Sequence, residues 1–137
     1  MNFLSIVILG ILSIIAIPET DVDIEKLYTT RWLWNTEGGY IHQSDSFDFV
    51  TFNSPKADSL DLQFKYGGLV FEKDSTLKEY VWNKCGTGNP PDYYEAKFEI
   101  ERNEGQWIIN ITNSRWWDGK FKLEAVSETN LKLIRII

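Results

Sequence analysis

The chain holds few residues of the types that catalyse reactions or bind metal ions. His42 is the single histidine and Cys85 the single cysteine among 137 residues. One cysteine cannot form an intramolecular disulfide, and these counts exclude zinc sites built from several cysteines or from a pair of histidines. The sequence therefore predicts no metal ion and no cofactor.

His42 lies close in sequence to Ser44 and Asp45, which together offer the residue types of a Ser-His-Asp relay. That relay depends on geometry, and residues this close on one loop cannot normally form it. The 20 Asp and Glu residues always supply pairs of carboxylates, so their number alone predicts no acid–base chemistry. We expect a protein that is not an enzyme.

The aromatic side chains are stronger candidates for a functional site. They make up 15% of the chain and include six Trp. Small-molecule pockets are mostly apolar with a few polar anchors, so aromatic side chains suit their walls. The same side chains can also simply fill the core of a small barrel. The residues that we expect to line a ligand cavity are Trp34, Phe49, Phe71, Tyr80, Trp82, Tyr94 and Trp107.

Trp116 and Trp117 form a further candidate. Adjacent residues of a strand face opposite ways, so both indoles cannot enter one core, and the flanking Ser114-Arg115 and Asp118-Gly119 favour a loop. An exposed Trp pair at a barrel mouth could contact a ligand, a partner or a membrane surface. Alternatively, one indole caps the barrel and the other lies across its rim.

Charge and the first residues indicate where the protein acts. The net charge of −6 argues against nucleic-acid binding, which needs clustered Lys and Arg. Residues 3–17 are an uncharged, apolar run, shorter than the ~20 residues of a membrane-spanning helix and typical of an export signal. We expect residues 1–18 to be a signal peptide, or alternatively a short membrane anchor. Residues 19–137 would then be an exported domain, periplasmic or secreted in a bacterial envelope, without stable insertion of the mature domain into a membrane.

After Thr30 the hydrophobic pattern has a period of two, which is typical of antiparallel strands with one buried face. Turn residues such as Gly67-Gly68 and Asn103-Glu104-Gly105 separate these stretches. Gly67-Gly68 is either a tight turn or a bulge within one long strand from Leu60 to Lys73. The expected strands are Arg31–Thr36, Phe47–Asn53, Leu60–Tyr66, Leu69–Lys73, Leu77–Asn83, Tyr94–Glu101, Trp107–Thr112, Phe121–Ala125 and Leu131–Ile136.

Short strands joined by short turns favour an all-β fold in which one antiparallel up-and-down sheet of about eight strands closes into a barrel. Ile24, Leu27 and Tyr28 have helical spacing, so a short helix or turn should precede the sheet. A barrel of this size is either filled by side chains or holds one small ligand.

The segments 30–32, 69–77 and 123–133 together resemble parts of bacterial lipocalin-like domains. The stretch Leu69-Val-Phe-Glu-Lys-Asp-Ser-Thr-Leu is similar to their L-x-F-x-x-D-G-T-x hairpin, with Ser75 in place of glycine. Thr30-Arg31-Trp32 is similar to the G-x-W start of lipocalins, with Thr30 in place of glycine. The end, with Leu123, Ser127, Leu131 and Leu133, is similar to the last hairpin of the family. The resemblance covers residues 27–137.

The resemblance implies structural roles for Trp32 and Arg135. Lipocalin-type barrels often place a basic side chain of the last strand over the tryptophan of the first, and the matching residues here are Arg135 and Trp32. A guanidinium over an indole contributes about 0.5–2 kcal/mol and would stabilise the barrel's closure. The alternative is that Arg135 points into solvent.

The resemblance and the aromatic content together predict a domain that binds a small apolar or amphipathic molecule. One fold can host many unrelated functions, so a second hypothesis stays open. In it the barrel is packed solid and acts as a protein-interaction module, such as an inhibitor or an immunity-type protein. The barrel interior discriminates the two, because a void indicates a carrier and a filled interior a scaffold.

Overall fold

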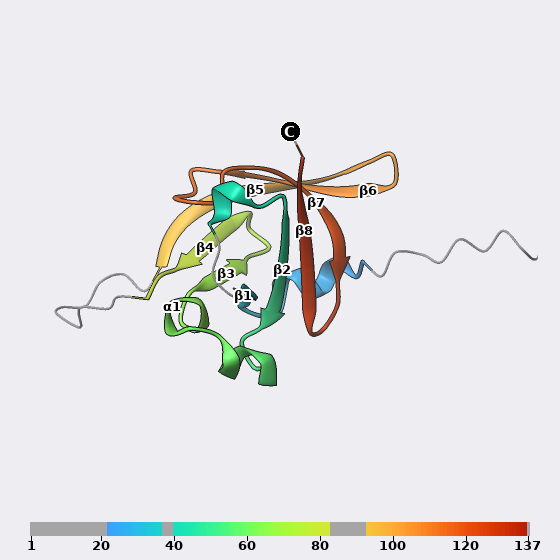
Figure 1. Cartoon of the computed structure of the whole chain (residues 1–137). Helices are drawn as coiled ribbons and strands as arrows, with labels where there is room; N and C mark the ends of the chain where they lie inside the picture. The colour runs from blue at the N-terminus through green and yellow to red at the C-terminus, as the bar shows by residue number, and fades with distance from the viewer. Residues whose placement is uncertain (1–21, 37–39, 83–92, 137) are drawn as a thin grey trace, which may run out of the picture.

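A computed structural model describes residues 22–36, 40–82 and 93–136, and these form a closed antiparallel β-barrel (Figure 1). The expected signal segment and Cys85 lie outside the described residues. The strands are β1 (Trp32–Trp34), β2 (Ser46–Thr51), β3 (Gly68–Phe71), β4 (Thr76–Tyr80), β5 (Tyr93–Asn103), β6 (Gln106–Thr112), β7 (Gly119–Val126) and β8 (Asn130–Ile136). The predicted all-β barrel of about eight strands is confirmed.

The order of the strands around the barrel is β1-β2-β8-β7-β6-β5-β4-β3. From β3 to β8 each strand pairs with the next one along the chain, which gives a simple meander. At the seam β1 lies between β2 and β3, and it pairs with β3 through Trp32 and Leu69 alone. In a barrel where every strand pairs with the next one along the chain, β2 would lie beside β3. Here β1 and β2 are interchanged, so β1 lies beside β3 and β2 beside β8.

The connection from β2 to β3 has to pass β1, and it does so on the outside of the barrel. It holds the 3₁₀-helix η4 (Pro55–Ser59) and the short helix α1 (Leu62–Lys65), seen in green in Figure 1. Leu33 on the outer face of β1 is fully buried and forms a second small core with Val50, Ala57 and Leu60. This cover explains why all three residues of β1 are buried.

The predicted strand Leu60–Tyr66 is therefore wrong. Its residues alternate between apolar and polar, but four of them form α1, and Leu62 and Tyr66 are exposed. A two-residue alternation over so few positions does not separate a strand from a single helical turn. Gly67-Gly68 is neither a turn nor a bulge of a long strand, because Gly67 follows the helix and Gly68 begins β3.

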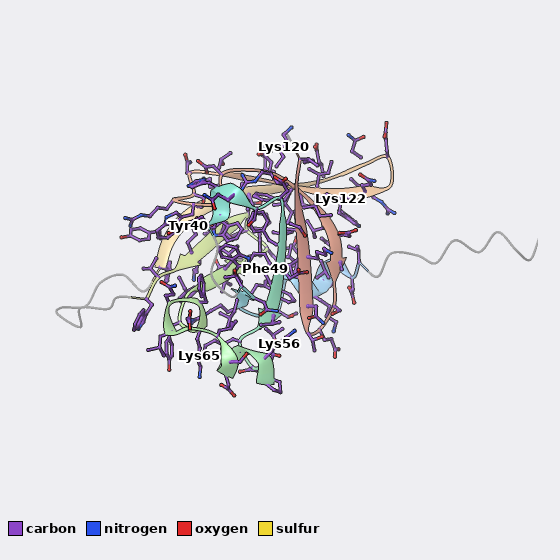
Figure 2. The ribbon with its side chains drawn as sticks, in the orientation of Figure 1. Tyr40, Phe49, Lys56, Lys65, Lys120 and Lys122 are labelled. Atoms are coloured by element: carbon purple, nitrogen blue, oxygen red, sulfur yellow. The ribbon has the colours of Figure 1, made fainter. Side chains whose placement is uncertain are left out.

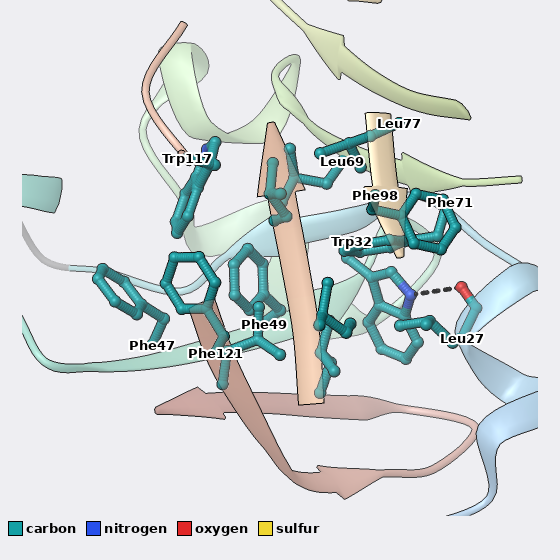
Figure 3. Packing of buried hydrophobic residues seen from close by; sticks show 14 of the residues in the cluster. Leu27, Trp32, Phe47, Phe49, Leu69, Phe71, Leu77, Phe98, Trp117 and Phe121 are labelled. Carbon is teal, nitrogen blue, oxygen red and sulfur yellow. Dashed lines mark hydrogen bonds between the residues drawn. The ribbon is translucent and has the colours of Figure 1, made fainter. Parts of the chain in front are cut away.

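The 3₁₀-helix η2 (Ile24–Tyr28) confirms the short helix expected before the sheet. Leu27 points from it into the barrel and is fully buried. The indole nitrogen of Trp32 donates a hydrogen bond to the carbonyl oxygen of Leu27 over 3.0 Å (Figure 3). An ion pair of 3.0 Å joins Glu25 to Lys73 in the β3–β4 turn. These contacts fix η2 across one end of the barrel, so that end is closed.

The interior is filled by the inward residues of successive strands, as the period-two pattern predicts. Figure 3 shows two groups of aromatic rings within this core. Trp32, Phe71 and Phe98 lie near η2, and the rings of Phe71 and Phe98 meet edge to face with centroids 5.2 Å apart. Phe47, Phe49, Phe121 and Trp117 form the other group, towards the opposite end.

Candidate ligand pocket at the open end of the barrel

A pocket of about 490 Å³ opens at the end of the barrel opposite η2. Its walls come from the end of β4 with the residues after it, from α1, from the 3₁₀-helix η3 (Ile41–Gln43) and from the β6–β7 loop, together with single residues of β1 and β2 and the start of β3. In Figure 2, Phe49 lies inside the barrel and Tyr40 beside η3 at its margin. The lining residues are Trp34, Tyr40, Ile41, His42, Phe49, Gln63, Phe64, Gly67, Gly68, Leu69, Glu79, Tyr80, Val81, Trp82, Trp116 and Trp117.

Trp117 is the central aromatic residue of this site. Although it belongs to a loop, its side chain is only 6% exposed, because it enters the barrel interior. Its ring meets Trp34 edge to face at 5.8 Å between centroids, and lies 5.1 Å from Phe47 and 5.4 Å from Phe49. Such edge-to-face contacts are favourable for aromatic rings, so the inner wall of the pocket is held in place by the core.

The β6–β7 loop is built around Ser114. The Ser114 hydroxyl oxygen accepts hydrogen bonds from the backbone N–H groups of Trp116, over 3.3 Å, and Trp117, over 2.7 Å. The backbone N–H of Ser114 in turn donates to the carboxylate of Asp118 over 2.7 Å. These local bonds turn the two indoles in different directions, with Trp117 inside and Trp116 39% exposed on the rim. The arrangement with one indole in the barrel and one across its rim is therefore the correct one.

Glu79 is a polar residue in the pocket wall. Its side chain is 2% exposed, because Glu79 occupies an inward position of β4. Its carboxylate accepts a hydrogen bond from the Ser114 hydroxyl, and its two oxygens each lie 3.2 Å from the backbone nitrogen of Arg115. Burial raises the pKa of Glu79 above its ordinary value, and these backbone hydrogen bonds only partly oppose the rise.

The rim carries cations that are stacked on aromatic rings. The Arg115 guanidinium lies 4.9 Å from the ring centroid of Trp116 and 5.1 Å from that of Tyr94. Arg31 lies over Tyr80, 3.9 Å from its centroid. Both contacts hold rim rings by cation–π attraction.

The structure brings together most of the residues predicted to bind a ligand. Trp34, Phe49, Tyr80, Trp82, Trp116 and Trp117 all line the pocket. Three predicted residues do not. Phe71 is buried in the core at the η2 end, Tyr94 is exposed on β5 beside Arg115, and Trp107 is half-buried beneath Arg102.

Arg135 does not lie over Trp32, in contrast to what the resemblance implies. The Trp32 indole is at the η2 end, whereas Arg135 is near the open end at the end of β8. The Arg135 guanidinium lies over Phe47 and Phe121, 5.4 and 5.3 Å from their centroids, and donates to the carbonyl oxygen of Ile41 over 3.1 Å. It thus joins η3 to the aromatic core instead of closing the barrel over the first tryptophan.

His42 lines the pocket from the exposed side of η3. Its neighbour Ser44 donates from its hydroxyl to the carbonyl oxygen of Tyr40 over 3.5 Å. In the described parts of the chain no hydrogen bond joins His42 to Ser44 or Asp45. The same parts contain no group of three or more His, Cys, Asp and Glu residues arranged to hold a metal ion.

Glu79 is a pocket residue that was not predicted from the sequence, although the strand pattern around it indicates an inward side chain. Leu77 and Glu79 are two residues apart in a predicted strand, so they share a face, and Leu77 marks that face as the inward one. A carboxylate at an inward position is the informative exception in a strand. The contributions of Gln63 and Phe64 could not be found in this way, because the alternation predicts a strand for their segment.

Comparisons of the chain with protein-family models, with curated proteins and with solved structures find no match. The geometry of the pocket therefore carries the functional argument by itself. None of the helices within residues 22–36, 40–82 and 93–136 has the length and apolar composition needed to cross a membrane.

Proposed function

We propose that this protein is an exported, non-enzymatic, lipocalin-like domain that binds one small apolar or amphipathic molecule in the pocket at the open end of its barrel. The observation that carries the proposal is the pocket itself. Its volume of about 490 Å³ lies within the range of about 300–1,000 Å³ that is typical of small-molecule sites. Half of its lining residues are Trp, Tyr or Phe, and a few are polar, which is a composition that such sites have.

The shape of the interior favours a carrier over a solid scaffold. A packed-barrel interaction module needs inward side chains that fill the barrel from end to end. Here the η2 end is filled by Trp32, Phe71 and Phe98. At the opposite end Phe49 and Trp117 are buried in the barrel but leave an open pocket against them.

The test is a titration of the purified protein with N-phenyl-1-naphthylamine, a neutral fluorophore that brightens in apolar sites. Wild-type protein should bind one molecule. Trp82→Ala should weaken binding about 10-fold, because a large lining ring is lost. Trp107→Ala is the matched control, since Trp107 is a half-buried indole outside the pocket, and it should leave the affinity unchanged.

The proposal fails if wild-type protein does not bind this probe, or if Trp82→Ala and Trp107→Ala weaken binding of the probe equally. Native mass spectrometry of protein purified from its own host provides a second measurement. A co-purifying small molecule bound to the wild type and lost from Trp82→Ala supports a carrier. An empty protein with a co-purifying protein partner supports the interaction module instead.

A further inference from the structure

The Glu79 carboxylate introduces a negative charge into the pocket wall and forms no ion pair within the described part of the chain, although the Arg115 guanidinium attracts it without direct contact. Its hydrogen-bond donors, the Ser114 hydroxyl and the Arg115 backbone N–H, are both neutral. Neutral donors satisfy the lone pairs of a carboxylate but do not cancel its charge. A buried charge is costly unless an opposite charge accompanies it.

The basic side chains nearest to Glu79 in the fold have other partners. The Arg115 guanidinium stacks on Trp116 and Tyr94. Burial raises the pKa of Glu79, and the Arg115 guanidinium lowers it in part without forming an ion pair with Glu79. Arg31 stacks on Tyr80. Lys78, the preceding residue of β4, pairs with Glu72 over 2.9 Å. None of the ion pairs within the described part of the chain includes Glu79. Asp118 adds a second negative charge close by.

The rest of the pocket wall complements a cation as well. The faces of indole rings carry negative potential and attract ammonium groups, and Trp34, Trp82 and Trp117 all line this site. A carboxylate surrounded by aromatic rings repels anionic ligands and would remain unpaired beside a neutral one. The net charge of −6 also raises the concentration of cations near the protein.

We propose that the ligand is an organic ammonium ion: a protonated amine or quaternary ammonium group that meets Glu79, attached to an apolar body that lies among Trp34, Phe49 and Trp117. This inference rests on the proposed function and names its ligand class. Glu79 would supply the opposite charge, and the aromatic rings would supply both apolar contact and cation–π attraction. The site would reject anions of the same size.

The experiment compares three naphthalene probes of similar size by isothermal titration calorimetry. They are 1-naphthylmethylamine, which is cationic, 1-naphthylmethanol, which is neutral, and 1-naphthoate, which is anionic. We expect wild-type protein to bind the amine about 10-fold or more tightly than the alcohol, and to bind the anion most weakly. Glu79→Gln should reduce the affinity for the amine to that for the alcohol, and it should leave the affinity for the alcohol unchanged.

Glu95→Gln is the control for the loss of one negative charge. Glu95 lies next to the partner of Glu79 in the β4–β5 register, but it is exposed on the outside of the barrel. It should leave all three affinities unchanged. If Glu79→Gln weakens amine and alcohol alike, the carboxylate acts only by holding the β6–β7 loop, and the ammonium inference is overturned.

Two outcomes separate this inference from the proposed function. Equal binding of amine and alcohol by wild-type protein refutes the ammonium ligand but keeps the pocket as a binding site. Binding of none of the three probes, together with no binding of the neutral fluorophore, refutes both.

A pH series on wild-type protein keeps the inference testable even if Glu79→Gln does not fold. Between about pH 5 and pH 8 an alkylamine stays protonated, so affinity for 1-naphthylmethylamine should increase as Glu79 ionises. His42 lines the same pocket, so the series is repeated on His42→Gln. An affinity that is flat or falls with increasing pH in both proteins overturns the inference.

Discussion

Glu79 shows how one inward polar residue can serve two purposes. Its hydrogen bonds with Ser114 and Arg115 connect β4 to the β6–β7 loop, and that loop carries both indoles of the pocket. The same burial that makes these bonds valuable also makes the ionised carboxylate costly. Its raised pKa expresses that cost.

The raised pKa predicts how the stability of the ligand-free protein depends on pH. In the unfolded chain the carboxyl titrates near its ordinary pKa of 4.5, so between that pH and its higher folded-state pKa the folded protein holds more protons. Stability from this group is therefore complete below about pH 4.5 and is lost as the pH rises through the folded pKa. Urea unfolding at a series of pH values should show wild type losing stability relative to Glu79→Gln as the pH rises.

Glu79→Gln is the right reference because glutamine can still accept hydrogen bonds through its side-chain oxygen but does not titrate. The other carboxyl groups titrate in both proteins and cancel in the difference. A difference that stays constant across the series, or that grows in favour of wild type at higher pH, would contradict this prediction.

Among the elements, the connection from β2 to β3 contributes to both the seam of the barrel and the pocket. It covers the outer face of β1 with Ala57 and Leu60, and it supplies Gln63 and Phe64 to the pocket wall. It ends in Gly68, whose φ of +104° is in the region that favours glycine. A Cβ atom at Gly68 would lie 2.5 Å from the carbonyl oxygen of Trp32. The seam between β1 and β3 therefore depends on the absence of a side chain there.

Gly68→Ala should lower the free energy of unfolding by about 2 kcal/mol or more, since it combines a backbone clash with an unfavourable φ. Gly105→Ala is the matched control. Gly105 also has a positive φ, of +77°, but a Cβ atom added there would meet no atom within 4 Å, so only about 1 kcal/mol should be lost. Urea unfolding of both variants measures the difference, and equal losses would show that the close approach at the seam is not important.

Most elements could be predicted from sequence because alternation of side chains is a local property of a strand. Tyr93–Asn103 and Gly119–Val126 form strands where the apolar–polar pattern is regular. The exception, Leu60–Tyr66, has the same local pattern, but the chain there has to cross outside β1. That requirement comes from the pairing of β1 with β3, two strands too far apart in the sequence for a local hydrophobic pattern to reveal it.

At the scale of the whole molecule, the barrel has one end that is filled and one that is open. Phe71 and Phe64 represent the two ends. Phe71 is fully buried and meets Phe98 edge to face at 5.2 Å, whereas Phe64 is half-buried in the pocket wall and meets Trp34 at 5.7 Å. Phe71 should therefore contribute to stability alone, and Phe64 mainly to ligand binding.

The same substitution at each end tests this division. Phe71→Leu should reduce the free energy of unfolding by about 1–2 kcal/mol through lost packing, with little change in the affinity for N-phenyl-1-naphthylamine. Phe64→Leu should lower the free energy of unfolding by less than about 1 kcal/mol, but it should weaken binding of the probe several-fold. Denaturant unfolding and fluorescence titration of both variants give the two quantities. Parallel losses in both variants would mean that the two ends are not independent.

The order of residues along the chain was enough to predict the all-β class and a closed barrel of about eight strands, because side-chain direction follows from local backbone geometry. Where the interior stays open depends instead on the folded arrangement. Trp117 enters the barrel from a loop, and Gly68 has no side chain that could clash with β1. Arg135 lies over Phe47 and Phe121 and not over Trp32. A void is the space left between side chains from distant parts of the chain, so its position depends on contacts that no spacing along the sequence specifies.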